Sequence, residues 1–244
     1  MRSAARSGYG GVGDAGARHQ YTDAHSRSRV IPAARHRPVS SRDRWSDRYA
    51  RALGDPATPS LVARRAPSAW VLARCLELPA HQLIVDVAGG DGRHALALAE
   101  RGRRVLVVDF VEGAVTAAVG AGQLFAATGT GAVLGLVADA GALPLAAGSL
   151  DALLVTNFLD RALFPHLASL LRRGGTLVAE TFTVEHLALA EARRIPSPRG
   201  PEHLLQRGEL RSLVAPLAVV AYREGLVRDA AGERVAAGVV AVRG

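Results

Sequence analysis

Three carboxylates and one turn of small residues are the parts of this 244-residue chain whose types and spacing could do chemistry. The turn lies in "VDVAGGDG", which contains Asp86, Ala88, Gly90 and Gly92. Small residues let a ligand approach the backbone closely, and the helix expected after the turn offers unpaired N–H groups and a positive dipole end. The turn therefore predicts a binding site for a nucleotide-like ligand.

Two classes of ligand fit this turn. "GDGRHA", residues 90–95, matches the G-x-G-x-x-G/A pattern of dinucleotide-binding proteins, so an NAD(P)-dependent oxidoreductase is one interpretation. Asp86, however, stands inside an apolar strand, where an uncompensated carboxylate is costly. The ammonium group of S-adenosylmethionine gives that acid a partner, although backbone N–H groups could also satisfy it. Asp86 favours S-adenosylmethionine, and NAD(P) stays the alternative.

Two more acids end predicted strands at the edge where open α/β sheets bind ligands. Asp109 closes the second strand, where a carboxylate can accept hydrogen bonds from both ribose hydroxyls, and Phe110 after it could cover one face of the adenine. Asp139 closes the third strand, followed by the small Ala140, and would face the adenine amino group. We predict that these four residues bind the cofactor.

Residues near the group to be transferred should follow the fourth and fifth strands. Asn157 and Phe158 follow the fourth, and residues 180–182 end the fifth. Asn157, Phe158 and His203 are the candidates for catalysis, His203 as a general base; a structural role is open for each. Asn157 is also predicted to contact the cofactor.

Two further predictions concern the first helix and the start of the helix after the turn. Trp45 and Tyr49 are four residues apart on one predicted helix face and could close over the cofactor as a lid or pack against the domain. Arg93 could meet the carboxylate of the cofactor or remain in solvent.

An alternation of strands and helices must position these residues. Strands are expected at 82–88, 103–110, 131–139, 149–158, 175–182, 217–225 and 234–244, and helices at 44–53, 66–78, 92–102, 112–127, 164–173 and 208–215. Alternating elements favour one doubly wound, Rossmann-like α/β sheet, and the last two strands predict an antiparallel hairpin at its edge.

The chain divides by composition into a tail and a domain. Residues 1–43 are rich in Arg, Ser and Gly with little to bury, so we expect a disordered tail. Residues 44–244 form the expected domain, which we divide into a helical cap at 44–78, a cofactor-binding core at 82–183 and a helix with two strands at 203–244. The alternative is that this tail binds nucleic acid.

Charge and cysteine content exclude several classes of protein. The formal net charge is +8, but residues 1–44 carry nine Arg and three Asp, so the remainder is nearly balanced and a nucleic-acid partner is not favoured. A single cysteine, Cys75, excludes an internal disulfide and a multi-cysteine zinc site. No carboxylate pair suggests another metal, and no apolar run reaches the roughly 20 residues of a membrane span. We therefore expect no metal, no membrane contact and a cytoplasmic location.

The same motifs resemble those of class I S-adenosylmethionine-dependent methyltransferases over about residues 45–244. The likeness lies in "VDVAGGDG", the acid of "VLVVDF", "DAGALPL", "SLDALLVTNFL" and "LLRRGGTLVAETF". Within that group, "DRWSDRY", "GRHALALAERG" and "PEHLLQRGEL" are most similar to small bacterial methyltransferases of the tellurite-resistance type. The resemblance implies a seven-stranded sheet, mostly parallel with an antiparallel last strand, and S-adenosyl-L-methionine as the cofactor.

The function expected from these motifs is methyl transfer to an unidentified small-molecule acceptor by a monomer or weak homodimer. After the fourth strand the chain reads "TNFLD", which lacks the Asn/Asp-Pro-Pro-aromatic pattern of enzymes that methylate amino groups of bases or glutamine. No cysteine lies near that strand, which argues against carbon-5 pyrimidine methylation through a cysteine adduct. The alternatives are an NAD(P)-dependent oxidoreductase and a cofactor-binding protein without catalysis.

Overall fold

The computed structural model describes residues 47, 49, 51, 66–195, 198 and 200–244. All of them belong to one compact unit, Val39–Gly244. The predicted tail, Trp45 and most of the first predicted helix lie outside the described residues, although residues 47, 49 and 51 are helical. The boundary between tail and domain therefore stays a prediction.

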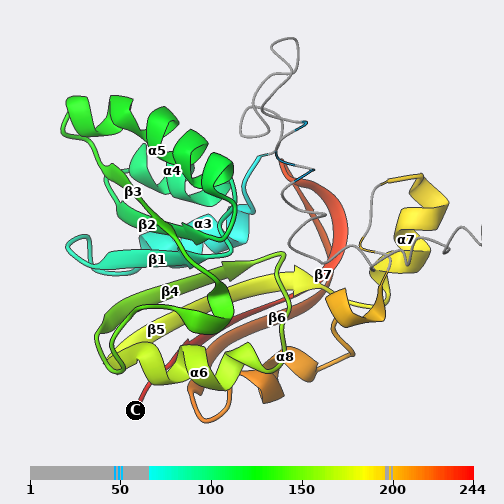
Figure 1. Cartoon of the computed structure of the whole chain (residues 1–244). Helices are drawn as coiled ribbons and strands as arrows, with labels where there is room; N and C mark the ends of the chain where they lie inside the picture. Colours follow the sequence, from blue (N-terminus) through cyan, green and yellow to red (C-terminus); the bar gives the residue numbers. More distant parts are fainter. Residues whose placement is uncertain (1–46, 48, 50, 52–65, 196–197, 199) are drawn as a thin grey trace, which may run out of the picture. The chain divides into compact units, whose positions relative to one another are not determined.

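A seven-stranded sheet in the order β3-β2-β1-β4-β5-β7-β6 forms the centre of this unit (Figure 1). The strands are β1 (Leu83–Val87), β2 (Arg104–Asp109), β3 (Ala132–Val137), β4 (Leu150–Thr156), β5 (Leu171–Phe182), β6 (Ala218–Asp229) and β7 (Gly232–Val242). The pairs among β1 to β5 are parallel, whereas β7 pairs antiparallel with both β5 and β6. The predicted doubly wound sheet, mostly parallel with an antiparallel last strand, is confirmed.

Helices cover both faces of the sheet. The described helices are α3 (Ala69–Leu76), α4 (Arg93–Ala99), α5 (Glu112–Ala127), α6 (Leu163–Leu170), α7 (His186–Arg193) and α8 (Glu209–Leu213), with short 3-10 turns η1 (Ala140–Ala142) and η2 (Pro201–His203). Figure 1 shows α3, α4 and α5 on one face and α6 and α8 on the other. None of the helices in the described part of the chain is long and apolar enough to cross a membrane.

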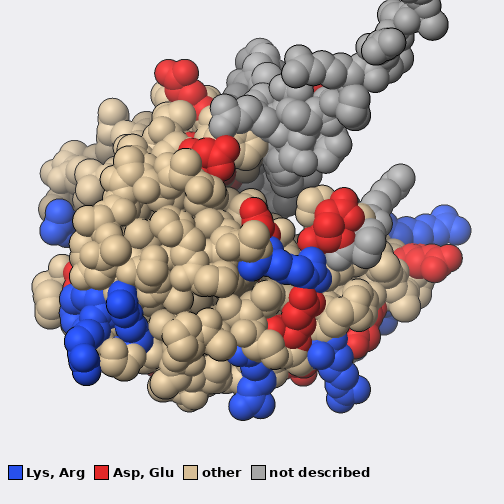
Figure 2. All heavy atoms as spheres, turned by 60° about the horizontal axis from the view of Figure 1, so that its bottom comes forward, with Lys and Arg blue, Asp and Glu red and all other residues tan. Residues whose placement is uncertain are grey.

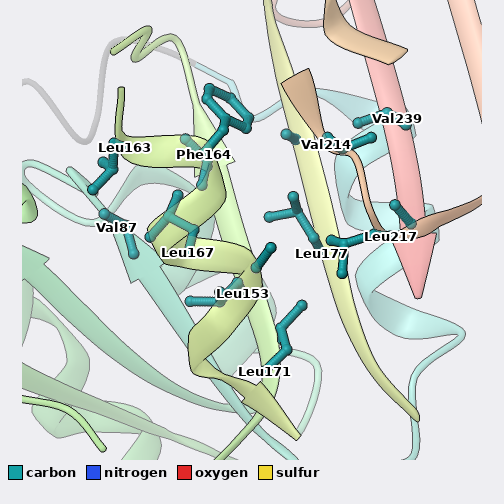
Figure 3. Close-up of a cluster of buried hydrophobic side chains, with 14 of the residues drawn as sticks. Val87, Leu153, Leu163, Phe164, Leu167, Leu171, Leu177, Val214, Leu217 and Val239 are labelled. Atoms are coloured by element: carbon teal, nitrogen blue, oxygen red, sulfur yellow. The ribbon is translucent and has the colours of Figure 1, made fainter. Parts of the chain in front are cut away.

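The central strands are apolar on both faces because both faces are covered. Leu153 of β4 and Leu177 of β5 pack in one hydrophobic cluster, which Figure 3 shows together with Phe164 and Leu167 of α6. The residues that follow them in each strand, among them Leu154, pack on the opposite face against α3 and α4. Asp86 therefore lies in a strand that is buried from both sides.

The predicted boundaries at residues 173 and 225 are wrong. The strand expected over 217–225 continues to Asp229. The helix expected over 164–173 ends at Leu170, and Leu171 already belongs to β5, where it pairs with Leu150. Arg172 donates from Nε to Asp151 Oδ1 at 2.7 Å, so this arginine stabilises the start of a strand and not the end of a helix. The β4–β5 register shifts between the pairs made by Leu150 and Ala152, beside the polar "RRGG" run.

A close contact between α5 and β3 gives a test of this packing. A Cβ at Gly122 would lie 2.6 Å from the Cβ of Val133, whereas a Cβ at Gly120, in the same helix, would meet nothing within 4 Å. We expect Gly122→Ala to lower the free energy of unfolding by about 1–3 kcal/mol. Gly120→Ala should raise it by about 0.5–1 kcal/mol, since alanine favours helix. Urea denaturation measures both, and equal effects would contradict the packing.

Candidate functional site

The glycine turn between β1 and α4 has an unusual backbone. Ala88, Gly90 and Gly92 all have left-handed φ angles, of 55°, 58° and 83°. A Cβ at Gly92 would lie 2.8 Å from the Cβ of Ala118 in α5, and a Cβ at Gly90 would lie 2.1 Å from the hydroxyl oxygen of Tyr49. Glycine is required at Gly92 by space as well as by conformation, whereas at Gly90 it is favoured by conformation, since the Tyr49 side chain could move aside.

Tyr49 therefore lies at the turn. Its hydroxyl group is beside Gly90, at the place where the predicted lid would close. The other half of that prediction, Trp45, is outside the described residues. Contact of Tyr49 with a cofactor stays a prediction.

Asp86 is the carboxylate of the site with the most unusual surroundings. Only 1% of the residue is exposed, and neither carboxylate oxygen has a hydrogen-bond partner among the described residues. Burial raises the pKa of Asp86 to about 7; Arg93 opposes this and the nearby Asp109 adds to it. The alternative considered from sequence, satisfaction by backbone N–H groups, is not seen in the described part of the chain. A cationic group placed here would relieve the unfavourable charge.

Asp109, at the end of β2, is buried and tied to the turn. Its Oδ2 accepts a hydrogen bond from the N–H of Gly90 at 3.0 Å, and its Oδ1 accepts one from the N–H of Val111 at 2.9 Å. Burial raises the pKa of this carboxyl, and the backbone hydrogen bonds oppose the rise. Each carboxylate oxygen has a second lone pair, so the group can still accept hydroxyl hydrogens from a ligand.

The end of β3 lies next to the end of β2. The N–H of Ala138 donates to the carbonyl of Asp109 at 3.0 Å. Asp139 is exposed and caps η1 by accepting from the N–H of Gly141 at 2.9 Å, with Ala140 as the first residue of that turn. Phe110 is half-buried. Asp86 within β1, Asp109 at the end of β2 and Asp139 two residues after β3 thus belong to three adjacent parallel strands or their ends; their contacts with a cofactor stay predictions.

The end of β4 has a left-handed residue too. Asn157 has a φ of 52°, and its N–H donates to the carbonyl of Glu180 at 2.9 Å. Left-handed alanine and asparagine persist only where the surroundings hold them, and such positions concentrate at functional sites. Ala88 and Asn157 follow the neighbouring strands β1 and β4. Phe158 packs partly against the hydrophobic core; its part in catalysis stays a prediction.

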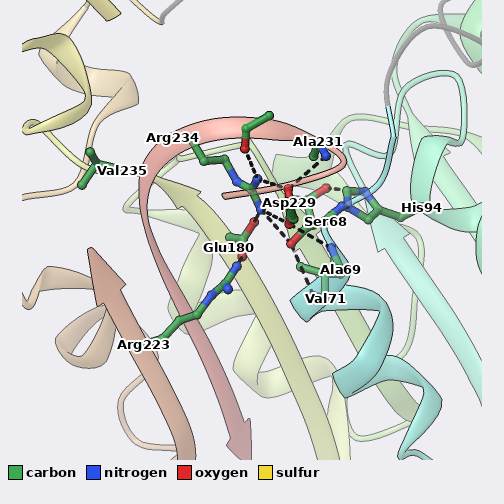
Figure 4. A network of polar contacts seen from close by, with 12 residues as sticks. Ser68, Ala69, Val71, His94, Glu180, Arg223, Asp229, Ala231, Arg234 and Val235 are labelled. Carbon is green, nitrogen blue, oxygen red and sulfur yellow. Dashed lines mark hydrogen bonds and ion pairs between the residues drawn. The ribbon is translucent and has the colours of Figure 1, made fainter. Parts of the chain in front are cut away.

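The predicted residues at the end of β5 have structural partners. The Glu180 carboxylate is buried and forms ion pairs with Arg223 and with Arg234, the latter at 2.9 Å (Figure 4). Thr181 is buried, and the ring of Phe182 stacks on that of His186 with centroids 4.5 Å apart. The Glu180 carboxylate is thus committed to a polar network.

His203 lies in η2 with its side chain 46% exposed, and its Nε2 is 3.6 Å from Glu202 Oε1. Arg161, which the sequence did not single out, fixes this segment: it bonds the carbonyl of Leu204 at 2.9 Å and pairs with Glu209 at 2.5 Å. A general-base role for His203 stays a prediction. Among the described residues, no group of three or more His, Cys, Asp or Glu could hold a metal ion.

Residues 84–175 match the family model described as a methyltransferase domain. No curated protein matches the chain. Similar solved structures include magnesium protoporphyrin IX methyltransferase from Synechocystis with bound S-adenosylhomocysteine, at a TM-score of 0.58 and 22% identity over 82% of this chain and 94% of that one. They also include an S-adenosylmethionine-dependent methyltransferase from Methanosarcina mazei, at 0.57 and 20% over 70% and 96%. A geranyl diphosphate C-methyltransferase from Streptomyces coelicolor matches at 0.55 and 17% over 80% and 88%.

These likenesses to solved structures show the fold, and the family model shows that residues 84–175 are similar to a methyltransferase domain. The matched residues begin in β1, include the turn and Asp109, and end in β5.

The left-handed alanine gives one prediction. Replacement of Ala88 by glycine should raise the free energy of unfolding by about 1 kcal/mol, because the left-handed conformation costs an L-residue about 1–2 kcal/mol and glycine loses some chain entropy in return. The matched control is Ala97→Gly in α4, which should lower stability by about 1 kcal/mol. Chemical denaturation that finds both changes destabilising would contradict the strain assigned to Ala88.

Asp86 gives a second prediction, on pH. Its folded pKa of about 7 exceeds the unfolded value of 3.8, so the folded protein holds more protons and this group lowers stability progressively as pH rises from about 4 to 7. The loss is at most about 4 kcal/mol. Asp86→Asn should abolish that part of the decline, seen by urea denaturation from pH 4 to 8. Asp151→Asn, whose carboxylate pairs with Arg172, is the control and should retain it; a decline unchanged in Asp86→Asn would contradict the assignment.

Proposed function

We propose that this protein is an S-adenosylmethionine-dependent methyltransferase. It transfers the methyl group of S-adenosylmethionine to a small-molecule acceptor bound beside the ends of β4 and β5. One observation carries the choice of donor: a buried carboxylate without a hydrogen-bond partner among the described residues stands beside the glycine turn. S-adenosylmethionine brings an ammonium group that can pair with Asp86. A dinucleotide brings pyrophosphate, whose negative charge would repel it.

The remaining predicted contacts follow from the strand ends. We assign the ribose hydroxyls to Asp109, the adenine amino group to Asp139, and the adenine face to Phe110 and Ala140. Asn157 would lie beside the donor at its methyl end. The sulfonium of the donor supplies an activated methyl group, so the protein must chiefly align the two reactants and exclude water.

The distribution of surface charge and the substrates of similar enzymes both support a small acceptor. On the face in Figure 2, basic side chains lie in several separate groups with acidic side chains between them, which is not the continuous basic patch of a nucleic-acid-binding surface. The similar structures named above include enzymes for magnesium protoporphyrin IX and geranyl diphosphate, both small molecules. We therefore favour a small molecule as the acceptor. We also propose that the protein acts as a monomer or weak homodimer in the cytoplasm.

The narrower resemblance to methyltransferases of the tellurite-resistance type is part of the proposal. It rests on "GRHALALAERG", which forms the turn and α4, and on "PEHLLQRGEL", which runs from η2 into α8. His203, in the second motif, is our candidate for a general base.

The proposal is tested with Asp109. We expect S-adenosylhomocysteine to raise the melting temperature of the unaltered protein and NAD(P) to leave it unchanged. Asp109→Ala should weaken binding of S-adenosylhomocysteine by about 10- to 100-fold, because charge-assisted hydrogen bonds contribute about 1.5–3 kcal/mol. Titration calorimetry measures the affinity, and circular dichroism checks the fold. Unchanged affinity in a folded variant would remove the ribose assignment, and stabilisation by NAD(P) alone would favour an oxidoreductase.

A further inference from the structure

His94, in the first turn of α4, has a role that the methyl-transfer chemistry does not itself require. It is only 3% exposed, and its two ring nitrogens bond to different segments of the chain. Nε2 accepts a hydrogen bond from the N–H of Ser68 at 3.1 Å, and Nδ1 lies 3.2 Å from Thr156 Oγ1. Burial lowers the pKa of His94 well below 6.5, so the ring is neutral. Because Nε2 accepts, the single proton must be on Nδ1 and is donated to Thr156.

These two bonds belong to a closed circuit of hydrogen bonds joined by short covalent links at residues 156–157 and within Glu180, part of which Figure 4 shows. From Thr156 the chain passes to Asn157, whose N–H donates to the Glu180 carbonyl at 2.9 Å. Arg234 then donates from Nη2 both to Glu180 Oε1 at 2.9 Å and to Ser68 Oγ at 3.0 Å. We call this set the hydrogen-bond ring; it consists of Ser68, His94, Thr156, Asn157, Glu180 and Arg234.

The hydrogen-bond ring joins segments that are far apart in sequence. Ser68 is the N-cap of α3, His94 begins α4, and Thr156 ends β4. Arg234 comes from β7, 166 residues after Ser68. Asp229, at the end of β6, adds a branch by accepting from the N–H of Ala69 at 3.1 Å and from Arg234 at 2.7 Å. The β6–β7 hairpin is thereby fastened to the start of α3.

We propose that His94 is a positioning residue, which through the hydrogen-bond ring holds the glycine turn in register with Asn157. The inference rests on the proposed function, since the turn is the donor's site and Asn157 is the residue expected beside the methyl group. Left-handed backbone at a non-glycine residue persists only where neighbours hold it. The ring constrains Asn157 through its own N–H and through Thr156, the residue before it. His94 connects these contacts to α4, the helix that follows the glycine turn.

A buried polar network does not give the greatest stability in this space. Apolar side chains of similar volume are often as stable as buried ion pairs, whereas hydrogen bonds fix direction and register. All six members have their partners on different segments, so the ring specifies where the segments stand relative to one another.

The test compares two substitutions at Thr156. Thr156→Val keeps the shape but removes the hydroxyl, and Thr156→Ser keeps the hydroxyl. We expect Thr156→Val to weaken binding of S-adenosylhomocysteine about 3- to 10-fold by calorimetry, as one buried hydrogen bond is lost, and Thr156→Ser to stay within about 2-fold of the unaltered protein. Leu98→Ala, on the buried face of α4 and outside the ring, controls for lost stability. Measured well below its melting temperature, it should bind normally.

Nitrogen-15 NMR of the histidine rings gives a readout that a loss of packing would not move. In all three proteins His94 should show the tautomer protonated on Nδ1, because the Ser68 N–H still donates to Nε2. In Thr156→Val the His94 Nδ1 resonance and the Asn157 amide signal should both shift, because Nδ1 loses its acceptor, whereas in Thr156→Ser they should stay. Equal affinities in Thr156→Val and Thr156→Ser, equal weakening in Leu98→Ala, or a His94 proton on Nε2 would overturn the positioning role alone. Failure of the unaltered protein to bind S-adenosylhomocysteine would instead overturn the proposed function and this role with it.

Discussion

The uncompensated charge of Asp86 is the constraint on which the site depends. β1 lies in the interior of the sheet, between β2 and β4, and apolar clusters cover both of its faces. A carboxylate in such a place loses its hydration and, among the described residues, gains no hydrogen bond in return. The folded protein can retain it only because the rest of the domain is stable enough, as is usual for functional residues that oppose folding. A bound cation would turn this cost into binding energy.

The backbone near Asp86 is also in an energetically unfavourable conformation. Ala88 and Asn157 hold left-handed conformations at the ends of neighbouring strands, and both are strained relative to glycine. Asp109 holds the turn from one side through its bond to Gly90, and the hydrogen-bond ring holds the β4 end from the other. Strain and unpaired charge are thus gathered at one edge of the sheet and fixed there by polar contacts from distant segments.

Much of this could be predicted from the sequence because it depends on local pattern. An acid within an apolar run, glycines at the following turn and acids at strand ends have a periodicity and spacing that point to one edge of a parallel sheet. The strand–helix alternation gave the fold for the same reason. The helix boundary at 170 was missed because Leu171 continues the apolar pattern of α6, and only pairing with Leu150 makes it a strand residue.

The polar networks could not be predicted, because their members are brought together by the fold. Nothing in "GRHALALAERG" indicates that His94 bonds to Ser68 and Thr156, and nothing near Glu180 in the sequence announces Arg234. The spacing of an isolated histidine or arginine contains no information on its partner. Glu180 consequently looked as suitable for chemistry as Asn157, although its carboxylate is already engaged by two arginines.

Carbon-13 NMR of the aspartate carboxyl groups, recorded as a function of pH with and without S-adenosylhomocysteine, tests the central claim most directly. The Asp86 resonance should titrate near pH 7 in the free protein. On binding, the ammonium group of the ligand should stabilise the charged carboxylate and move the midpoint down by at least one unit. A midpoint that is near 4 in the free protein, or one that does not move when the ligand is bound, would contradict the account.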